Sequence, residues 1–392
     1  MKKILVIPSW YPSIDEPWSG TFFREQTLLF QPEHEFKVLL TKEVKTGRIG
    51  RIANTLLFLS TNIIRLSKLN NHFIEPPKVE AFEYAEKINR FKSINFKYIT
   101  KAYLQGFAEI IKTWKPDIIH AHVTRKAGMI SYSIYRQFGI PYIISEHNQP
   151  TLFDSESFVN HNYLEAINNA KKILMVGQKQ KQILVSLGVK ENIEVIGNFV
   201  DEHKFLPVEK NNRKFIILFI GFFIPEKDYL TLINTIKEYS DNCKDKNFYF
   251  RIIGCGNKGK EFILQQLKNS AVLENVEIIP FVKRSDIPFY QRNSDVFLST
   301  SIYETFGVSM CEAMMCGNPV VSTDNGGFDE MYVPGVNGIK CNTGDYKQLA
   351  EALLEIKKKE VQFSPHAIRE SVLAKFGTQA FKHRLNAIYN NI

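Results

Sequence analysis

The sequence has no long apolar run. A transmembrane helix needs roughly 18 uninterrupted apolar residues, and the longest candidate, residues 52–66, is broken by Asn54, Ser60, Thr61, Asn62 and Arg65. The apolar run after Met1 ends at Pro8, which is too early for a signal peptide. The five cysteines, an odd number without a C-x-x-C pair, exclude a disulfide framework and a zinc ribbon. These absences predict a cytoplasmic protein with buried thiols and a buried first strand.

Two ligand-binding motifs are also missing. The first apolar run is followed by Pro8-Ser9-Trp10-Tyr11-Pro12 and not by G-x-G-x-x-G, which argues against a dinucleotide oxidoreductase. No D-x-D triplet occurs that would hold a divalent cation against a diphosphate. His120 and His122 form an H-x-H pair on one face of an expected strand, but no third metal-ligand pattern accompanies them. We therefore expect neither a metal nor a cofactor.

Positive charge is concentrated in the first half of the chain. Residues 1–200 hold 26 Lys and Arg against 18 Asp and Glu, whereas residues 201–392 are nearly balanced at 24 against 23. The basic first half could bind an anionic membrane surface or a phosphorylated acceptor, or its charge could simply belong to a soluble basic surface. The basic residues are dispersed, which argues against nucleic acid. Segment 42–70 mixes basic and apolar residues, either as a helix on an anionic membrane or as a helix with its apolar side in the core.

Short apolar runs alternate with segments of helical period in both halves. This alternation predicts βαβ units and parallel sheets, and therefore an α/β protein with two Rossmann-like domains. The expected boundary is the polar segment 201–214. The tail after Ser364 has the apolar spacing of a final helix. The expected strands are residues 4–7, 37–40, 117–121, 142–145, 172–176, 193–196, 215–220, 248–253, 276–279, 296–298 and 319–322.

The most informative stretch is residues 299–322. A strand at 296–298 is followed by a loop through Gly307, a helix over about 308–315, and Gly317 and Pro319 after its end. The free amides at the start of this helix, at the carboxyl edge of the sheet, are suited to hold an anionic phosphate. Glu304 precedes the helix and Glu312 lies within it, and carboxylates accept hydrogen bonds from sugar hydroxyls.

Glu304 and Glu312 form an E-x7-E pair, embedded in further matching residues: Phe306-Gly307, Ala313, Gly317, Pro319-Val320-Val321, Gly326-Gly327, Glu330 and Asn337-Gly338. This stretch resembles retaining glycosyltransferase family 4, the group 1 glycosyltransferases. The resemblance implies the GT-B fold, two Rossmann-like domains facing each other across a cleft. It implies that Glu304 contacts donor-sugar hydroxyls, that Glu312 contacts the ribose, and that amides around Phe306, Gly307 and Val308 hold the diphosphate.

A second stretch, residues 219–228, resembles the family's G-R-x-x-x-x-K-G segment, in which Arg and Lys clamp the pyrophosphate. Lys227 matches the lysine, but Phe222 stands at the arginine position and Asp228 at the closing glycine. A lysine neutralises a phosphate as a point charge, whereas the bidentate fork of an arginine is lost. Arg284 and Arg125 are the candidates to replace it.

The remaining resemblances occur in the family's order along the chain. Residues 195–201 resemble the family segment V-I-x-N-G-V-D, which makes Asn198 a candidate donor-binding residue. Val282 lies after an expected strand, at the position where the family contacts the nucleotide base. Trp10-Tyr11-Pro12 with Ser19-Gly20-Thr21-Phe22 resembles the first glycine loop, in which Gly20 would leave room for a phosphate or sugar. His147 follows an expected strand, where family members carry a histidine that reaches the donor sugar.

The resulting prediction is a metal-independent, retaining, hexosyltransferase-type glycosyltransferase. Residues 1–200 would bind the acceptor, residues 201–375 the nucleotide-sugar donor, and residues 376–392 would form a helix on the first domain. His147, Glu304 and Lys227 are the expected catalytic residues. The expected acceptor is a glycan or lipid-linked glycan of surface polysaccharide synthesis, used in the cytoplasm or on the inner face of the membrane. Alternatives are a nucleotide-sugar-binding subunit with little or no turnover, and a sugar-nucleotide epimerase or phosphorylase.

Overall fold

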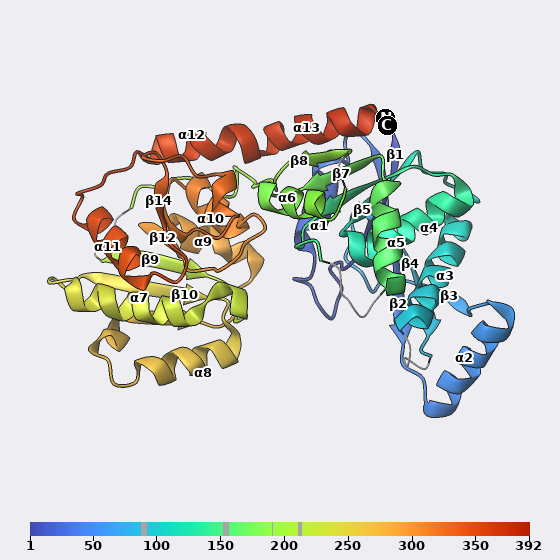
Figure 1. The fold of residues 1–392 in the computed structure, drawn as a ribbon, viewed down its shortest axis with the longest axis horizontal. Helices are drawn as coiled ribbons and strands as arrows, with labels where there is room; N and C mark the ends of the chain where they lie inside the picture. The colour runs from blue at the N-terminus through green and yellow to red at the C-terminus, as the bar shows by residue number, and fades with distance from the viewer. Residues whose placement is uncertain (88–91, 152–156, 190, 211–213) are drawn as a thin grey trace. The chain divides into compact units, whose positions relative to one another are not determined.

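The computed structural model describes residues 1–87, 92–151, 157–189, 191–210 and 214–392. The chain divides into two compact units, each an α/β assembly (Figure 1). Unit 1 comprises Met1–Val176, Gln180–Ile196 and Leu385–Ile392, and unit 2 comprises Gly177–Lys179 and Gly197–Arg384. Among the described residues, no helix is both long and apolar enough to cross a membrane.

Unit 1 is built on an eight-stranded sheet in the order β3-β4-β2-β1-β5-β6-β7-β8. Every neighbouring pair is parallel except β3 and β4, which are antiparallel. The strands are β1 Lys3–Pro8, β2 Glu35–Val44, β3 Leu66–Leu69, β4 Lys78–Ala85, β5 Ile118–His122, β6 Tyr142–Glu146, β7 Lys172–Met175 and β8 Ile193–Val195. The strand order reverses between β1 and β5, and in open parallel sheets the ligand crevice lies outside the carboxyl ends of the strands at such a point.

Helices follow most of these strands in unit 1. They are α1 Thr21–Phe30, α2 Arg48–Thr61, α3 Lys92–Ile110, the short turn η1 Thr124–Gly128, α4 Met129–Phe138, α5 Ser157–Asn168 and α6 Gln178–Ser186. Figure 1 shows α2 standing apart from the other helices of this unit.

Unit 2 has a six-stranded sheet, entirely parallel, in the order β11-β10-β9-β12-β13-β14. Its strands are β9 Phe215–Ile220, β10 Phe248–Ile253, β11 Val276–Ile279, β12 Val296–Ser299, β13 Val320–Thr323 and β14 Gly338–Cys341. Its helices are η2 Pro225–Lys227, α7 Tyr229–Asn242, α8 Gly256–Leu267, η3 Ala271–Asn275, η4 Arg284–Asp286, α9 Ile287–Arg292, α10 Val308–Met315, η5 Phe328–Glu330, α11 Tyr346–Lys357 and α12 Pro365–Phe376. Helix α13, Thr378–Asn390, ends the chain and contributes its last residues to unit 1.

The expected parallel strands are all present in the structure. They could be predicted because a parallel strand has helices on both faces of its sheet and is therefore a run of apolar residues. β9, of sequence FIILFI, coincides with the predicted range. Three strands were not predicted: β3, β4 and β14. β4 mixes charged and apolar residues and directly follows Pro76-Pro77, so its pattern is that of a strand nearer the edge of a sheet. The tail after Ser364 forms two helices and not one, since Gly377 separates α12 from α13, and the helix expected over residues 376–392 corresponds to α13.

The end of α13 packs into unit 1. Tyr389 is almost fully buried, and its hydroxyl lies 2.6 Å from Nδ1 of His120 on β5. Asn386 lies 3.0 Å from Nε2 of His34, and the Tyr389 ring meets Phe30, Phe36 and His34 edge-on. Residues 385–392 therefore belong to the first unit, and Leu385, Ile388 and Tyr389 are buried in it.

We predict that Tyr389→Phe lowers the free energy of unfolding by about 1–3 kcal/mol, because a buried ring nitrogen of His120 loses its partner. Urea unfolding followed by circular dichroism measures the change. The matched control is Tyr346→Phe, at a half-buried position on α11. Equal effects at both positions would contradict the assignment of the Tyr389 hydroxyl to a buried hydrogen bond.

Candidate functional site

The strand order of unit 2 reverses between β9 and β12, so the chain leaves these neighbouring strands toward opposite sides. In open parallel sheets, ligands bind in the crevice outside the strand ends at this point. β9 ends at Ile220 and is followed by Gly221, and β12 ends at Ser299. The crevice therefore brings together two stretches that the sequence singles out, residues 219–228 and 299–312.

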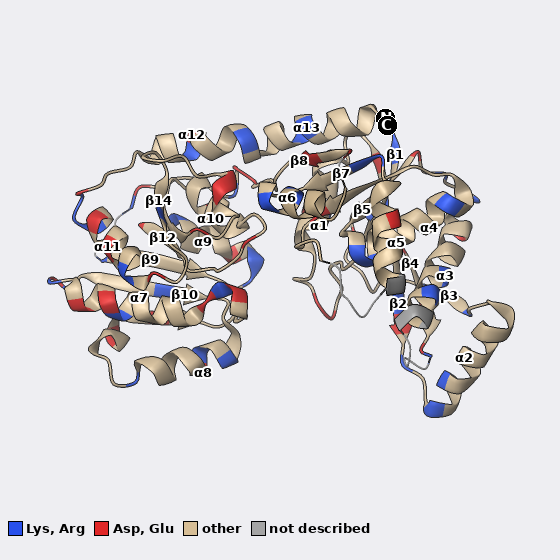
Figure 2. Cartoon of the chain, in the orientation of Figure 1, with Lys and Arg blue, Asp and Glu red and all other residues tan. Residues whose placement is uncertain are grey.

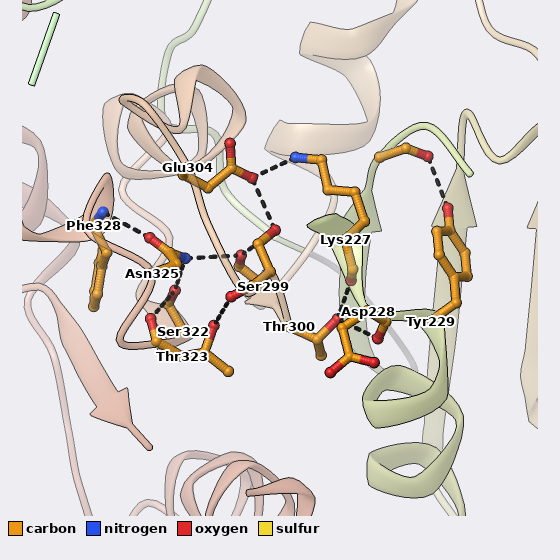
Figure 3. A network of polar contacts seen from close by, with 12 residues as sticks. Lys227, Asp228, Tyr229, Ser299, Thr300, Glu304, Ser322, Thr323, Asn325 and Phe328 are labelled. Atoms are coloured by element: carbon orange, nitrogen blue, oxygen red, sulfur yellow. Dashed lines mark hydrogen bonds and ion pairs between the residues drawn. The ribbon is translucent and has the colours of Figure 1, made fainter. Parts of the chain in front are cut away.

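Lys227 and Glu304 form an ion pair across this crevice (Figure 3). Lys227 ends the short helix η2 after β9, and Glu304 lies in the loop after β12. Ser301 Oγ donates to the same Glu304 oxygen at 2.9 Å. Both charged side chains are roughly one-sixth exposed, at 17% and 16%. The pair is thus held by the fold but remains within reach of a ligand.

Two hydroxyl groups and a buried amide fix the loop that carries Glu304. Thr300 Oγ1 donates to the carbonyl oxygen of Lys227 at 2.8 Å, which ties β12 to η2. The Asn325 side chain, fully buried, accepts from Phe328 N at 3.0 Å and donates to Ser322 Oγ at 3.0 Å. The Asn325 carbonyl then accepts from Glu304 N at 2.9 Å. Asn325 was not predicted as a site residue, because an asparagine followed by two glycines has the composition of an ordinary turn.

The glycines next to this loop leave no room for a side chain. A Cβ on Gly327 would lie 2.6 Å from Glu304 Cβ, and one on Gly177 would lie 2.3 Å from the Thr305 carbonyl oxygen. Gly327 and Gly177 thus allow their backbones to pack directly on residues 304–306. Sequence reasoning missed Gly177, which lies 127 positions before Glu304 and belongs to unit 2 although it follows a strand of unit 1.

The start of helix α10 directly follows the Glu304 loop. Gly307 is its N-cap at φ +82°, a left-handed conformation that favours glycine. As a glycine, this N-cap has no side chain to cap the first turn, and Phe306 is buried against Phe376 at a ring-centroid distance of 4.9 Å. The backbone amides of the first turn, beginning at Val308, carry the positive end of the helix dipole at the crevice.

Glu312 is buried on α10 and forms an ion pair with Arg284 of η4. Val282 is half-buried in the short segment between β11 and η4, so this pair connects that segment to α10. Of the two arginines considered as replacements at position 222, Arg284 is thus paired with Glu312. Phe222 itself is 70% exposed. Arg125 belongs to unit 1, where its guanidinium donates to the Thr151 carbonyl at 3.1 Å.

Asn198 is half-buried in unit 2. The preceding Gly197 has φ +69°, and a Cβ there would lie 2.6 Å from the Phe376 ring and 3.1 Å from the Phe306 ring. This packing brings the segment of Asn198 against the loop that ends at Gly307. Unit 2 therefore gathers Lys227, Glu304 and Phe306–Val308 with Asn198 and the Glu312 pair.

Gly20 and His147 belong to unit 1, at its own crevice. Gly20 is the N-cap of α1 at φ +67°, and a Cβ there would lie 2.7 Å from the Trp10 carbonyl oxygen. The close approach that requires glycine is therefore to Trp10 of the same loop. Phe22 and Phe23 of α1 pack on the His147 ring at centroid distances of 4.9 and 5.1 Å. Helix α1 thus brings the glycine loop next to His147.

His147 is joined to two buried histidines of β5. Its Nε2 lies 3.3 Å from Nδ1 of His122, and the His122 ring stacks on His120. His120 Nε2 contacts Ser145 Oγ at 2.7 Å. Burial, with a smaller contribution from His147, lowers the pKa of His120 to about 3, and burial also lowers the pKa of His122. Both rings are therefore neutral at physiological pH, and His120 contacts Tyr389 and Ser145 within the core.

A buried carboxylate orders the same edge of the sheet. Glu146, at the end of β6, accepts hydrogen bonds from the amides of Thr124 and Asn148, both at 2.9 Å. Burial raises its pKa, and the hydrogen bonds partly offset that effect. Val123, next to Thr124, has φ +74°, which is strained for a β-branched residue. The strain lies directly after His122, at the crevice of unit 1.

We predict that the free energy of unfolding falls as the pH drops below about 6.5, because the unfolded chain then protonates His120 while the folded chain does not until about pH 3. Each such histidine makes the free energy of unfolding fall by up to about 1.4 kcal/mol per pH unit between these two pKa values. His120→Asn should remove one such slope in urea unfolding at pH 7, 6 and 5. The control His383→Asn, on the surface of α13, should leave it unchanged. A His120→Asn slope equal to that of the wild type would contradict the neutral buried ring.

Comparison with known proteins gives two family matches. The family model described as glycosyl transferases group 1 matches residues 200–372, and that of Glycosyltransferase Family 4 matches residues 74–204. An uncharacterized glycosyltransferase of Methanocaldococcus jannaschii, MJ1178, is 27% identical over 317 residues, which are 79% of this chain and 86% of that protein.

Two further similarities bear on what such proteins bind. The N,N'-diacetylbacillosaminyl-diphospho-undecaprenol alpha-1,3-N-acetylgalactosaminyltransferase of Campylobacter jejuni is 25% identical over 230 residues, 55% of this chain and 59% of that protein. The structure of Anabaena Alr3699/HepE in complex with UDP matches with a TM-score of 0.71 at 19% identity and covers 100% of both chains.

Proposed function

We propose, from the premise that the chain belongs to the group 1 glycosyltransferases and has the GT-B fold, that it transfers a sugar with retention from a nucleoside-diphosphate sugar. The acceptor is a glycan or a lipid-linked glycan in surface polysaccharide synthesis. The observation that carries this proposal is the Lys227–Glu304 pair in the crevice of unit 2, next to the first turn of α10.

In this proposal the diphosphate of the donor lies on the first turn of α10. Amides of residues 306–308 donate to its oxygens, and Lys227 neutralises the charge that grows on the leaving group. Lys227 is suited to this role because η2 and Thr300 fix its backbone while Glu304 holds its ammonium group at the crevice. The departing diphosphate then accepts the acceptor's proton. The reaction needs no metal ion and no other cofactor, since these donors supply the positive charge.

Glu304 and Glu312 have separate roles in this scheme. Glu304, partly exposed, accepts from hydroxyl groups of the donor sugar, and Ser301 orients the carboxylate for this task. Glu312 is buried beside Arg284, whose side chain is 40% exposed. The ribose would reach the pair on the side of Arg284, which is the exposed partner. Val282 would then lie next to the base, and Asn198 near the diphosphate.

Unit 1 is proposed to bind the acceptor, and His147 at its crevice is proposed as a catalytic residue. The excess of Lys and Arg in residues 1–200 suits an acceptor that carries phosphate. A lipid-linked acceptor is supported by the Campylobacter jejuni relative, whose name gives a diphospho-undecaprenol sugar as its acceptor. We place the reaction in the cytoplasm, at the inner face of the membrane.

UDP is the proposed nucleotide, because the Anabaena structure with a similar fold contains UDP. Thermal shift with UDP-, GDP- and ADP-sugars tests this choice. We expect the melting temperature to rise most with a UDP-sugar, since ligand that binds only the folded chain stabilises it. Glu304→Ala and Glu312→Ala should lose most of the rise, each read against its own ligand-free melting temperature, since Glu312→Ala also breaks a buried ion pair.

Glu109→Ala, an exposed glutamate on α3 that pairs with Lys112, is the matched control and should respond like the wild type. If no nucleotide sugar stabilises the chain, or if both site variants respond like the control, the proposed donor site is wrong. A larger response to GDP- or ADP-sugars would correct only the nucleotide.

Phe222 motivates a second candidate, a nucleotide-sugar-binding subunit with little turnover. It is exposed, and the family's arginine fork is missing at its position. This candidate predicts donor binding without transfer across a panel of acceptors. An epimerase on the same fold would instead convert the donor in the absence of acceptor, which analysis of the sugar nucleotides detects.

For the transferase we predict that Lys227→Met lowers kcat by about 100- to 1000-fold, because one preorganised charge opposite the leaving group is lost. The donor-induced thermal shift should fall much less. Lys283→Met, an exposed lysine between β11 and η4, is the control. NMR of the product should show the donor's anomeric configuration. A kcat within threefold of the wild type, or an inverted product, would contradict this mechanism.

A further inference from the structure

Helix α2 has its apolar side toward solvent. Ile49, Ile52, Leu56 and Leu59 are 84%, 41%, 61% and 60% exposed. At about 100° per residue these four positions fall within an arc of about 80° on one face of the helix. We call this set the α2 stripe. Ile63, just beyond the helix end, is 53% exposed and extends it.

The opposite face of α2 holds the helix on unit 1. Phe58 is the one buried residue of the helix, and its ring meets Tyr98 at a centroid distance of 4.9 Å. Asn54 donates to the Glu86 carbonyl at 3.0 Å, and Arg51 pairs with the Glu86 carboxylate at 3.6 Å. These contacts fix which face is turned inward. The outward position of the stripe is therefore determined by the contacts of the inner face.

This orientation resolves the two interpretations of segment 42–70. An apolar side packed in the core is contradicted, because the spaced isoleucines and leucines are exposed. In place of a continuous helix, the segment folds as the end of β2, then α2, then β3. Contiguous exposed apolar residues of this kind mark an interaction surface.

The charge around the stripe identifies its partner. Residues 44–74 contain five Lys and Arg and no Asp or Glu. Lys45, Arg48, Arg65 and Lys68 are exposed, and in Figure 2 helix α2 carries blue segments and no red. A second copy of the chain would place the same positive charges against one another. An anionic bilayer instead attracts the basic residues and takes up the apolar ones.

We propose that α2 is a docking element that lies in the surface of an anionic bilayer, with the stripe among the acyl chains and the basic residues at the lipid headgroups. The role of this docking rests on the proposed function, because an enzyme that uses a lipid-linked acceptor works at a membrane surface. The binding itself needs neither donor nor transfer.

Flotation of the full chain with vesicles tests the proposal. Vesicles of phosphatidylcholine with about 30% phosphatidylglycerol should bind the wild type at least about tenfold better than pure phosphatidylcholine. The triple variant Ile52→Ser, Leu56→Ser, Leu59→Ser should lose at least about tenfold in binding. The pair Arg48→Gln, Arg65→Gln should lose a similar factor, less so at high salt.

Each variant has a matched control. Val185→Ser, Leu206→Ser, Leu264→Ser removes three apolar side chains that are 41%, 42% and 37% exposed outside α2. Lys268→Gln, Lys347→Gln removes two exposed charges from unit 2. Both controls should float like the wild type. The donor-induced thermal shift should be unchanged in the α2 variants, so failure of docking and failure of the donor site are distinguishable.

A site-specific label gives a second measurement. All five native cysteines are buried, so an environment-sensitive dye on Leu56→Cys reports on the stripe, and one on Val185→Cys is the control. The dye at position 56 should shift to the blue with anionic vesicles, and the dye at 185 should not. Equal flotation of the stripe and control variants, no shift at position 56, or a wild-type dimer that the triple variant dissociates without any vesicle binding would overturn the proposal.

Discussion

The pairing of β9 with β12 is the constraint on which the candidate site depends. These strands are neighbours in the sheet but are about 80 residues apart in the chain, and the chain leaves them in opposite directions. Lys227 and Glu304 meet only because both follow the carboxyl ends of this pair. Thr300 then closes the connection by donating to the Lys227 carbonyl. Sheet topology, more than either side chain, creates the local charge arrangement that a diphosphate would meet.

The sequence predicts much of this arrangement because its strands are short, apolar and regularly separated by helices. The E-x7-E pair, the glycine at 307 and the lysine at 227 could be placed because each follows such a strand. Other parts depend on distant contacts and could not be predicted. Gly177 is required by the Thr305 carbonyl, the Arg284–Glu312 pair joins two separate segments, and Asn325 acts through a buried hydrogen-bond set.

The same limit applies to helix α2 and to the glycine loop. Periodicity shows that α2 has an apolar side, but only the Glu86 and Tyr98 contacts determine which side is inward. Gly20 was expected to make room for a ligand, whereas its backbone conformation and the nearby Trp10 carbonyl already require a glycine. The sequence pattern of a helix predicts which residues share a face. Whether that face is turned to the core or to solvent depends on the residues from elsewhere in the chain that pack against the helix.

The interleaving of the two units has a consequence for dissecting the protein. The chain passes from unit 1 to unit 2 after Val176, returns at Gln180, leaves again after Ile196 and returns at Leu385. A fragment cut at Ile196 would therefore lack Tyr389, and the buried edge of His120 would face water. Supplying residues 385–392 as a separate peptide, or joining them through a linker to Ile196, would be needed to rebuild the first unit. Residues 385–392 are thus needed for the first unit to fold, although they are far from the rest of that unit in the sequence.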